Sequence, residues 1–506
     1  MWEKNLIRLL IFAGLILNFA CSRKTAEKRS PNIILIMADD LGYNELGSYG
    51  QKIIKTPRLD QLAAEGIRFT DFYAGSPVCA PSRCVLLTGK HTGHAYVRDN
   101  YELGGYTDET EGGQLPLSQG TETIGTLLKE KGYVTGIIGK WGLGGPGSTG
   151  VPNKQGFDYF YGYLCQKQAH NYYPTHLWEN EHWDTLNNTF FMAHQRLEGD
   201  PEDPQSYKKY KGQDYALDKM RDKALNFIQE HKDTSFFLYL PVTVPHLAIQ
   251  VPEDEPSLAE YKQLIPDTPY VGNKGYLPNQ FPRAGYASMI TRMDREIGKI
   301  IDLLKSLHLH ENTLVIFTSD NGPTYGGIGG SDTEYFESKK PFTGLKGSVY
   351  EGGIRVPMIV WWPRKTTAGS ESAHVSAFQD MLPTLLELVG GPIPQNVDGI
   401  SFLPTLINSE QPEHEYLYWE FPAYGGQQAL RKGNWKALRK NLNKDPKAPI
   451  ELYDLENDVA ELHDVADQHP ELIKEIENIL RTARTPSDTF AFPALDIFEE
   501  AFQKGN

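Results

Sequence analysis

The chain is poor in cysteine, in positive charge and in long apolar runs, and each shortage argues against a class of protein. Four Cys among 506 residues cannot build a disulfide scaffold. Fifty Lys and Arg against 65 Asp and Glu leave a formal net charge of −15. That charge disfavours a general nucleic-acid binder, because such proteins need a basic surface. Hydrophobic residues make up 40% of the chain, so a large buried core is expected and global disorder is disfavoured.

One apolar run, residues 9–20, follows Lys4 and Arg8 near the N-terminus. It is too short to cross a bilayer as a mature helix, so residues 1–20 are predicted to be a secretory signal peptide. Cys21 comes next, and a Cys at that place resembles the lipid acceptor of bacterial lipoproteins. We favour lipidation of Cys21 over simple cleavage near Ala20. Both alternatives predict export to the periplasm or cell envelope of a bacterium, with membrane contact only through a lipid anchor.

Short apolar runs separated by helical patterns predict an α/β fold. The strands are expected at 33–37, 134–138, 236–240, 314–318 and 357–362, and the helices at 56–66, 121–131, 215–230 and 286–304. This alternation predicts a parallel or mixed sheet with helices on both faces. The Pro-rich stretches 200–205 and 252–282 are predicted to be surface loops.

The pattern changes in the last hundred residues. Short segments at 416–421, 428–431, 436–439 and 451–454 predict a small antiparallel sheet, and 470–484 predicts a helix packed on it. We therefore expect a catalytic α/β domain over 31–410 and a C-terminal subdomain over 411–506.

Polar residues follow the predicted strands directly. Asp39 and Asp40 follow the first strand, Lys140 the second, His246 the third, and Asp320 with Asn321 the fourth. Ligands bind beyond the carboxyl ends of the strands in such sheets, so these side chains are expected to converge. Three carboxylates and one amide oxygen suit Ca²⁺ or Mg²⁺ better than zinc. If the Asp39-Asp40 pair or Asp320 occurred alone, an ordinary solvated turn would explain the acidic residues equally well.

The segment 76–89 carries a second chemical signal. Pro81 is predicted to start a helix with Cys79 near its positive end, an environment that attracts anions and lowers a thiol pKa. Arg83 lies one turn further on and faces the same point. From spacing alone, an ordinary buried Cys beside a helix start is an equal interpretation. Cys84 and Cys165 are expected to be buried thiols, with a disulfide as the alternative.

The pattern Cys79-x-Pro-Ser-Arg83-x-x-x-Leu-Thr-Gly89 resembles the signature of the type I, formylglycine-dependent sulfatases, the arylsulfatase family. The segments 39–42, 139–141, 319–322 and 344–357 also match that family's pattern. The resemblance covers about residues 31–464. It implies an alkaline-phosphatase-like fold, with a mixed, mainly parallel sheet between helices and a smaller C-terminal subdomain of antiparallel sheet plus helix. It also implies a sulfuric ester hydrolase.

The resemblance also assigns residue roles. It implies that a maturation enzyme oxidises Cys79 to formylglycine (3-oxoalanine), whose hydrate is the nucleophile. It implies one Ca²⁺, with Mg²⁺ the weaker candidate. The implied metal ligands are Asp39, Asp40, Cys79, Asp320 and Asn321. Arg83, Lys140 and Lys346 would surround the sulfate, and His246 would be the general acid on the leaving sugar oxygen.

One position departs from the family pattern. Many relatives have a His two residues after the lysine, whereas this chain has Gly142 there. His91 and His94 are candidates to compensate, although two His in a loop are more often surface residues. The departure suggests a subgroup with its own substrate geometry.

The stretch 166–178 is rich in groups that bind sugars, including His170, Tyr173 and His176. A tyrosine-rich loop packed on the domain is an equally good interpretation. Arg98 and Asn100 are two further candidates for substrate binding. The subgroup resembles bacterial exo-acting 6-O-sulfatases on N-acetylgalactosamine or galactose of chondroitin-type or mucin-type glycans. A 4-O-sulfatase is the alternative.

Two other classes remain open from the residues. A phosphatase or phosphodiesterase of the same superfamily would use two zinc ions and several His ligands, and no such pair of sites is evident in the sequence. A non-catalytic glycan-binding lipoprotein would not need the intact motif at Cys79. The sequence therefore predicts a carbohydrate sulfatase acting on a sulfated glycan, with a formylglycine-generating enzyme as partner.

Overall fold

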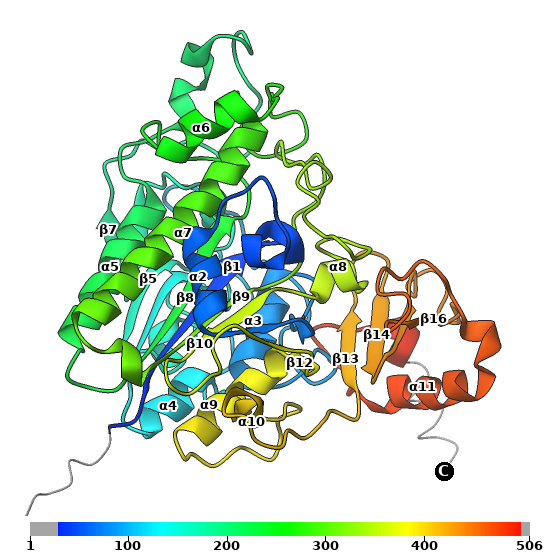
Figure 1. Ribbon diagram of the computed structural model, residues 1–506. Coiled ribbons are helices and arrows are strands. Elements are labelled where there is room, and N and C mark those ends of the chain that lie inside the picture. Colours follow the sequence, from blue (N-terminus) through cyan, green and yellow to red (C-terminus); the bar gives the residue numbers. More distant parts are fainter. Residues whose placement is uncertain (1–28, 497–506) are drawn as a thin grey trace, which may run out of the picture.

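The computed structural model describes residues 29–496. The predicted signal peptide and Cys21 lie outside this range. A ten-stranded sheet forms the centre of the larger part of the molecule, with strand order β11-β2-β10-β9-β1-β8-β4-β5-β6-β7 (Figure 1). In that order the strands are β11 (Ser370–Ser372), β2 (Ile67–Phe69), β10 (Met358–Trp361), β9 (Thr313–Ser319), β1 (Asn32–Asp39), β8 (Phe236–Pro245), β4 (Val134–Lys140), β5 (Tyr159–Tyr163), β6 (His176–Glu179) and β7 (His182–Thr185).

Helices cover both faces of this sheet, as the sequence predicted. Successive residues of β1 enter opposite layers, with Ile34 and Ile36 in one and Ile33 and Leu35 in the other, because side chains alternate along a strand. One layer holds α2 (Pro57–Glu65), α5 (Ala216–Glu230), α6 (Pro256–Leu264) and α7 (Pro282–Ser306). The other holds α3 (Cys79–Thr88), α4 (Ile124–Glu130), α9 (Met381–Leu388) and α10 (Leu403–Leu406).

The central strands β9, β1, β8, β4 and β5 run parallel, which leaves their carboxyl ends at one edge. β10 is antiparallel to β9, and the β6–β7 hairpin extends the far edge, so the sheet is mixed and mainly parallel. Two short strands, β3 (Phe72–Tyr73) and β12 (Ser376–Ala377), pair separately, and α8 (Glu351–Ile354) precedes β10.

The predicted loop over 252–282 contains a helix. In α6, the Glu255 side chain caps the first turn by accepting from Ser257 N, and Pro256 occupies a first-turn position. Pro at the first turn together with an acidic cap is a helix-start signal, and the abundance of proline in the stretch obscured it. The stretch at 200–205 likewise runs into a 3₁₀ helix, Pro204–Tyr210. Cys84 and Cys165 are buried free thiols.

The C-terminal part is a separate antiparallel sheet with one helix. Its order is β13 (Leu417–Phe421), β14 (Gln427–Lys432), β15 (Trp435–Arg439) and β16 (Glu451–Asp454), and α11 (Pro470–Thr482) packs on one face. Figure 1 shows it at the side of the large sheet. Within residues 29–496, no helix is both long and apolar enough to cross a membrane.

Candidate active site

The carboxyl ends of four neighbouring strands carry the polar side chains that the sequence singled out. Ala38 of β1 pairs with Ser319 of β9, so Asp39 and Asp40 lie directly beside Asp320. Asp320 N donates to Ala38 O at 3.1 Å, and Asp40 N donates to Asp320 Oδ1 at 3.1 Å. β8 leads into His246, and β4 ends at Lys140. Parallel pairing therefore brings together residues up to 281 positions apart.

Cys79 begins helix α3 and its sulfur lies within this cluster. Sγ is 3.6 Å from Asp39 Oδ1, 3.7 Å from Lys140 Nζ and 3.5 Å from Lys346 Nζ. Lys346 comes from the loop before α8, which is fixed by Lys346 N donating to Pro323 O and Gly347 N donating to Pro77 O. The Cys79 side chain is 2% exposed, so the reactive position lies at the bottom of the site.

Each cation in the cluster is tied to a carboxylate. Lys140 Nζ donates to Asp39 Oδ2 at 2.8 Å, and Lys346 Nζ donates to Asp40 Oδ2 at 2.9 Å. Arg83 donates to Asp320 Oδ2 at 2.8 Å. Three cations thus face three carboxylates and their charges cancel. A divalent cation added here would leave an excess of positive charge, which suits an anionic substrate.

The donor set fits a hard metal ion. Asn321 Nδ2 donates to Asp40 Oδ1 at 2.8 Å, while the buried Asn321 Oδ1 has no hydrogen-bond partner within residues 29–496. Ligand atoms of Asp39, Asp40, Cys79 and His246 all lie within 4.8 Å of one another. An unpartnered amide oxygen beside three carboxylates matches the oxygen ligands that Ca²⁺ and Mg²⁺ prefer.

The expected lowering of the Cys79 thiol pKa is wrong. Burial raises the pKa of Cys79 to about 12, although Lys140 and Lys346 act in the opposite direction. Desolvation, together with the charges of Asp320 and Asp39, disfavours the thiolate more than the two lysines favour it. The unmodified thiol is therefore protonated at neutral pH.

Family models match nearly all of the described chain. A sulfatase model covers residues 31–391, and a model described as N-sulphoglucosamine sulphohydrolase, C-terminal, covers residues 345–485. The chain belongs to the sulfatase family. It is a sulfuric ester hydrolase, and its similarity to carbohydrate sulfatases identifies it as one of them. Its fold is the alkaline-phosphatase-like fold of its structural neighbours. The family implies a metal ion and a formylglycine.

Curated relatives span most of the chain. It is similar to N-acetylgalactosamine-6-O-sulfatase of Bacteroides thetaiotaomicron, 30% identical over 95% of this chain and 100% of that protein. It is also similar to human N-acetylgalactosamine-6-sulfatase, 31% identical over 77% of this chain and 68% of the relative. Human arylsulfatase A is 32% identical over 90% of this chain and 88% of its own length.

A solved sulfatase structure agrees. The crystal structure of Ps i-CgsB, 30% identical, matches 89% of this chain and 93% of its own with a TM-score of 0.71, and that protein has also been solved in complex with k-i-k-neocarrahexaose.

In this sulfatase, Gln166 occupies the space beside position 142. Gly142 has a φ of +77°, and a Cβ built there would meet Gln166 Nε2 at 2.5 Å. Gln166 is buried and its Nε2 has no partner within the described residues. His91 and His94 do not fill this place. They stack on each other beside Asp398, and His91 contacts Tyr418 of the C-terminal subdomain.

A histidine and tyrosine wall stands beside the cluster, and sequence reasoning found only part of it. His170 stacks on His246, with ring centroids 5.0 Å apart and planes at 16°. His194 Nε2 lies 3.1 Å from His170 Nδ1, and Tyr276 N donates to His194 Nδ1 at 3.1 Å. Tyr276 comes from the stretch 252–282 that the sequence predicted to be a surface loop, but neither Tyr276 nor His194 was a site candidate. Tyr276 has a φ of +60°, which is unusual for a bulky residue and marks a constrained position.

The His246 ring is oriented by its own loop. Its Nδ1 donates to Leu247 O at 2.6 Å in the neutral form, which leaves Nε2 facing Asp40 Oδ2 at 3.7 Å. Burial, followed by Lys140 and Lys346, lowers the pKa of His246 to about 4. An anionic group bound beside the ring would favour its protonated form, because opposite charge stabilises the ion.

The other substrate-binding candidates have different places. Asn100 Oδ1 accepts from Ala80 N at 2.9 Å, so Asn100 lies at the start of α3. The structure does not bring Arg98, Tyr173 or His176 to the cluster. Arg98 is buried in an ion pair with Glu420, Tyr173 packs on Tyr215, and His176 contacts Glu111 and stacks on Trp183. Tyr173 and His176 therefore pack within the fold, which is the alternative that the sequence left open for the stretch 166–178.

Proposed function

We propose that this protein is an exo-acting sulfatase that removes the 6-O-sulfate from N-acetylgalactosamine or galactose at the end of a chondroitin-type or mucin-type glycan. The observation that carries the proposal is the position of Cys79, buried between Lys140 and Lys346 beside an oxygen-rich cluster. The N-acetylgalactosamine-6-sulfatases of Bacteroides and human favour the 6-O position over the alternative 4-O position. A nucleophile this deeply buried admits a chain end more readily than the middle of a polymer.

In this proposal a maturation enzyme converts Cys79 to formylglycine, which supplies a hydrated aldehyde as the oxygen nucleophile. Asp39, Asp40, Asp320 and Asn321, with the modified Cys79, would hold one Ca²⁺, which would supply positive charge to an anionic substrate. Lys140, Lys346 and Arg83 orient the sulfate and neutralise the charge that grows on it. The nucleophile's oxygen bonds to sulfur as the bond between sulfur and the sugar oxygen breaks. The His246 ring, protonated when the anionic sulfate is bound beside it, gives its Nε2 proton to that sugar oxygen. Such a proton transfer contributes roughly 10²- to 10⁴-fold in rate.

The wall formed by His170, His194 and Tyr276 is assigned to the sugar ring. Aromatic faces stack on pyranose rings, and ring nitrogens bind hydroxyl groups. Gln166 Nε2 is assigned as a further donor to the substrate, because it is buried without an acceptor. The signal segment at 1–20 and Cys21 support a periplasmic or envelope location with a lipid anchor, and a role in glycosaminoglycan degradation.

Two measurements test this function. Mass spectrometry of the peptide containing Cys79 should show the aldehyde in place of the thiol. A panel of 6-O- and 4-O-sulfated galactose and N-acetylgalactosamine, assayed on matured enzyme, should give turnover of the 6-O-sulfates. Cys79→Ala should abolish that turnover. Activity that survives this substitution would contradict the mechanism, and preference for 4-O-sulfates would contradict the assigned position.

A further inference from the structure

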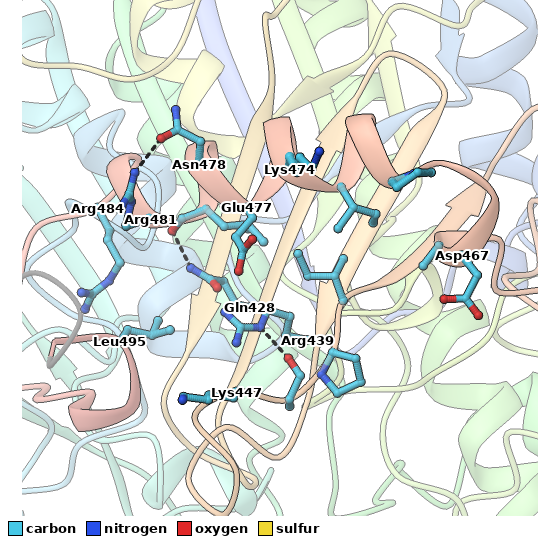
Figure 2. A pocket seen from close by; sticks show the side chains of 17 residues that line it. Gln428, Arg439, Lys447, Asp467, Lys474, Glu477, Asn478, Arg481, Arg484 and Leu495 are labelled. Atoms are coloured by element: carbon cyan, nitrogen blue, oxygen red, sulfur yellow. Dashed lines mark hydrogen bonds between the residues drawn. The ribbon is translucent and has the colours of Figure 1, made fainter.

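The C-terminal subdomain contains a cavity of about 930 Å³ that takes no part in the candidate active site. Figure 2 shows α11 crossing over the strands, with Lys474, Glu477 and Asn478 on the helix and Gln428 and Arg439 on the sheet side. The loop at 447–450 and Leu495 complete the walls. Ligand sites typically have volumes of about 300–1,000 Å³, so the cavity is large enough for several sugar units.

One wall atom lacks a partner that a ligand could provide. Gln428 is 1% exposed, and its Nε2 donates to Tyr418 OH and Leu480 O at 2.8 Å. Its Oε1 is buried without a hydrogen-bond partner in the described part of the chain. A buried acceptor without a hydrogen bond costs about 1–3 kcal/mol, and a hydroxyl group of a bound ligand would supply that bond.

The charge of the walls favours an anion. The lining residues with charged side chains are the cations Arg439, Lys447, Lys474, Arg481 and Arg484 and the anions Asp467 and Glu477. Lys474 and Arg484 have carboxylate partners outside the cavity, Glu471 for the first and Glu420 with Asp496 for the second.

Two of the lining cations differ from Lys474 and Arg484 in their contacts. Arg439 donates only to the carbonyls of Ala448 and Pro446, and neither Arg439 nor Lys447 forms an ion pair within residues 29–496. Burial lowers the pKa of Arg439, and the nearby charges of Glu477 and Asp445 act in the opposite direction.

The cavity and the active site use opposite faces of one strand. Gln427 Nε2 donates to Gly347 O at 2.7 Å, next to Lys346, whereas the following residue Gln428 points into the cavity. Neighbouring residues of a strand point to opposite faces. The small sheet therefore lies between the cavity and the loop that carries Lys346.

We propose that this cavity is a second, non-catalytic binding site for a sulfated or uronate-bearing segment of the glycan that the active site cleaves. A sulfate or carboxylate binds Arg439 and Lys447, a sugar hydroxyl donates to Gln428 Oε1, and the ring packs on Ile450 and Ile473. The inference rests on the proposed function for the class of ligand. It adds an anchor that keeps the enzyme on its polymer between turnovers.

The test uses the full chain with Cys79→Ala, which prevents turnover, and a chondroitin 6-sulfate octasaccharide as the probe. Lys447→Glu should weaken binding by roughly threefold to tenfold, because a favourable charge contact becomes a repulsive one. The matched control is Lys444→Glu, an exposed residue of the same loop that does not line the cavity. Hydrogen exchange should show protection of 439–450 and 470–484 by the octasaccharide. An unsulfated chondroitin octasaccharide separates recognition of sulfate from recognition of carboxylate.

Equal binding by the Lys447→Glu and Lys444→Glu variants, or protection confined to the active site, would overturn the inference. On a sulfated monosaccharide, matured enzymes carrying either substitution should have unchanged kcat and KM, because that substrate does not reach the cavity. Failure of the proposed function is distinguishable, since wild-type enzyme would then not hydrolyse the monosaccharide either.

Discussion

His170 and His246 stack face to face, 5.0 Å apart, at the edge of the acidic cluster. His246 is fixed on one side by its hydrogen bond to Leu247 O and on the other by this neighbouring ring. His170 is in turn held by His194. The general acid that we propose is therefore positioned by residues from three separate segments of the chain.

This arrangement predicts which substrates depend on His246. His246→Ala should reduce kcat on alkyl sugar sulfates by roughly 10²- to 10⁴-fold and affect activated aryl sulfates much less, because an aryl oxide leaves without protonation. Steady-state kinetics on 4-nitrophenyl sulfate and on galactose 6-sulfate provide the comparison. Equal losses on both would argue against His246 as the acid.

His170 is predicted to be a positioning residue. His170→Ala should lower kcat on the sugar sulfate, because the His246 ring loses its support. His170→Phe keeps a ring for stacking and should restore much of kcat while still raising KM for the sugar. If the Phe variant behaves like the Ala variant, the nitrogen of His170 matters and the stacking does not.

Gln166 is predicted to bind substrate in the space beside Gly142. Gln166→Ala should raise KM, since the buried donor that we assign to the substrate is lost. The factor should correspond to about 1 kcal/mol for one hydrogen bond. Gln114 is a matched control, because its Nε2 is also buried without a partner while its Oε1 accepts from Gln166 N. An effect of Gln114→Ala on KM as large as that of Gln166→Ala would show that local packing, and not contact with substrate, explains the loss.

Removal of the metal should inactivate the enzyme and lower its thermal stability. Incubation with EGTA is expected to abolish turnover and lower the thermal midpoint, because an ion that binds only the folded protein stabilises it. Ca²⁺ should restore both properties better than Mg²⁺, since the site offers several oxygen ligands of mixed type. Asn321→Ala should weaken the calcium-dependent shift of the midpoint. A chelated protein with unchanged midpoint and activity would contradict the metal assignment.

Glu255 should stabilise the fold in a pH-dependent way. Burial alone would raise its pKa, but bonds from Arg295 and Arg292 reverse this and lower the pKa of Glu255 to about 2. The stabilisation is therefore complete above the ordinary glutamate pKa of about 4.5 and is lost as the pH falls toward 2. Glu255→Gln should cost about 3 kcal/mol at pH 7, because two arginines lose their buried partner.

Thermal midpoints at pH 7 and pH 3 check this expectation. The difference between wild type and Glu255→Gln should shrink at pH 3. Glu253→Gln serves as control, because Glu253 pairs with Lys211 at the surface and should change the midpoint little. A difference that stays constant across this pH range would show that the side chain acts through shape rather than charge.

Some elements of the fold were predictable from the sequence and others were not. The apolar runs of β1, β4, β8 and β9 were predictable, because strands buried on both faces have few polar residues. Helix α6 was missed, because its start is embedded in a Pro-rich stretch that looked like loop. Tyr173 and His176 matched a sugar-binding pattern by type, but burial places them in the fold, and sequence composition does not report which way a side chain points.

The amino-acid sequence by itself determined the strand ends, the order of the polar residues and the motif around Cys79, because strand and helix patterns are local and leave a periodic trace. Tertiary structure alone decided that Lys140 and Lys346 both reach Cys79 Sγ, that Gln166 fills the space beside Gly142, and that His194 and Tyr276 join His170. It also raised the Cys79 pKa through burial, against the local helix effect. These properties depend on contacts between distant segments and on the exclusion of water, which no local pattern encodes.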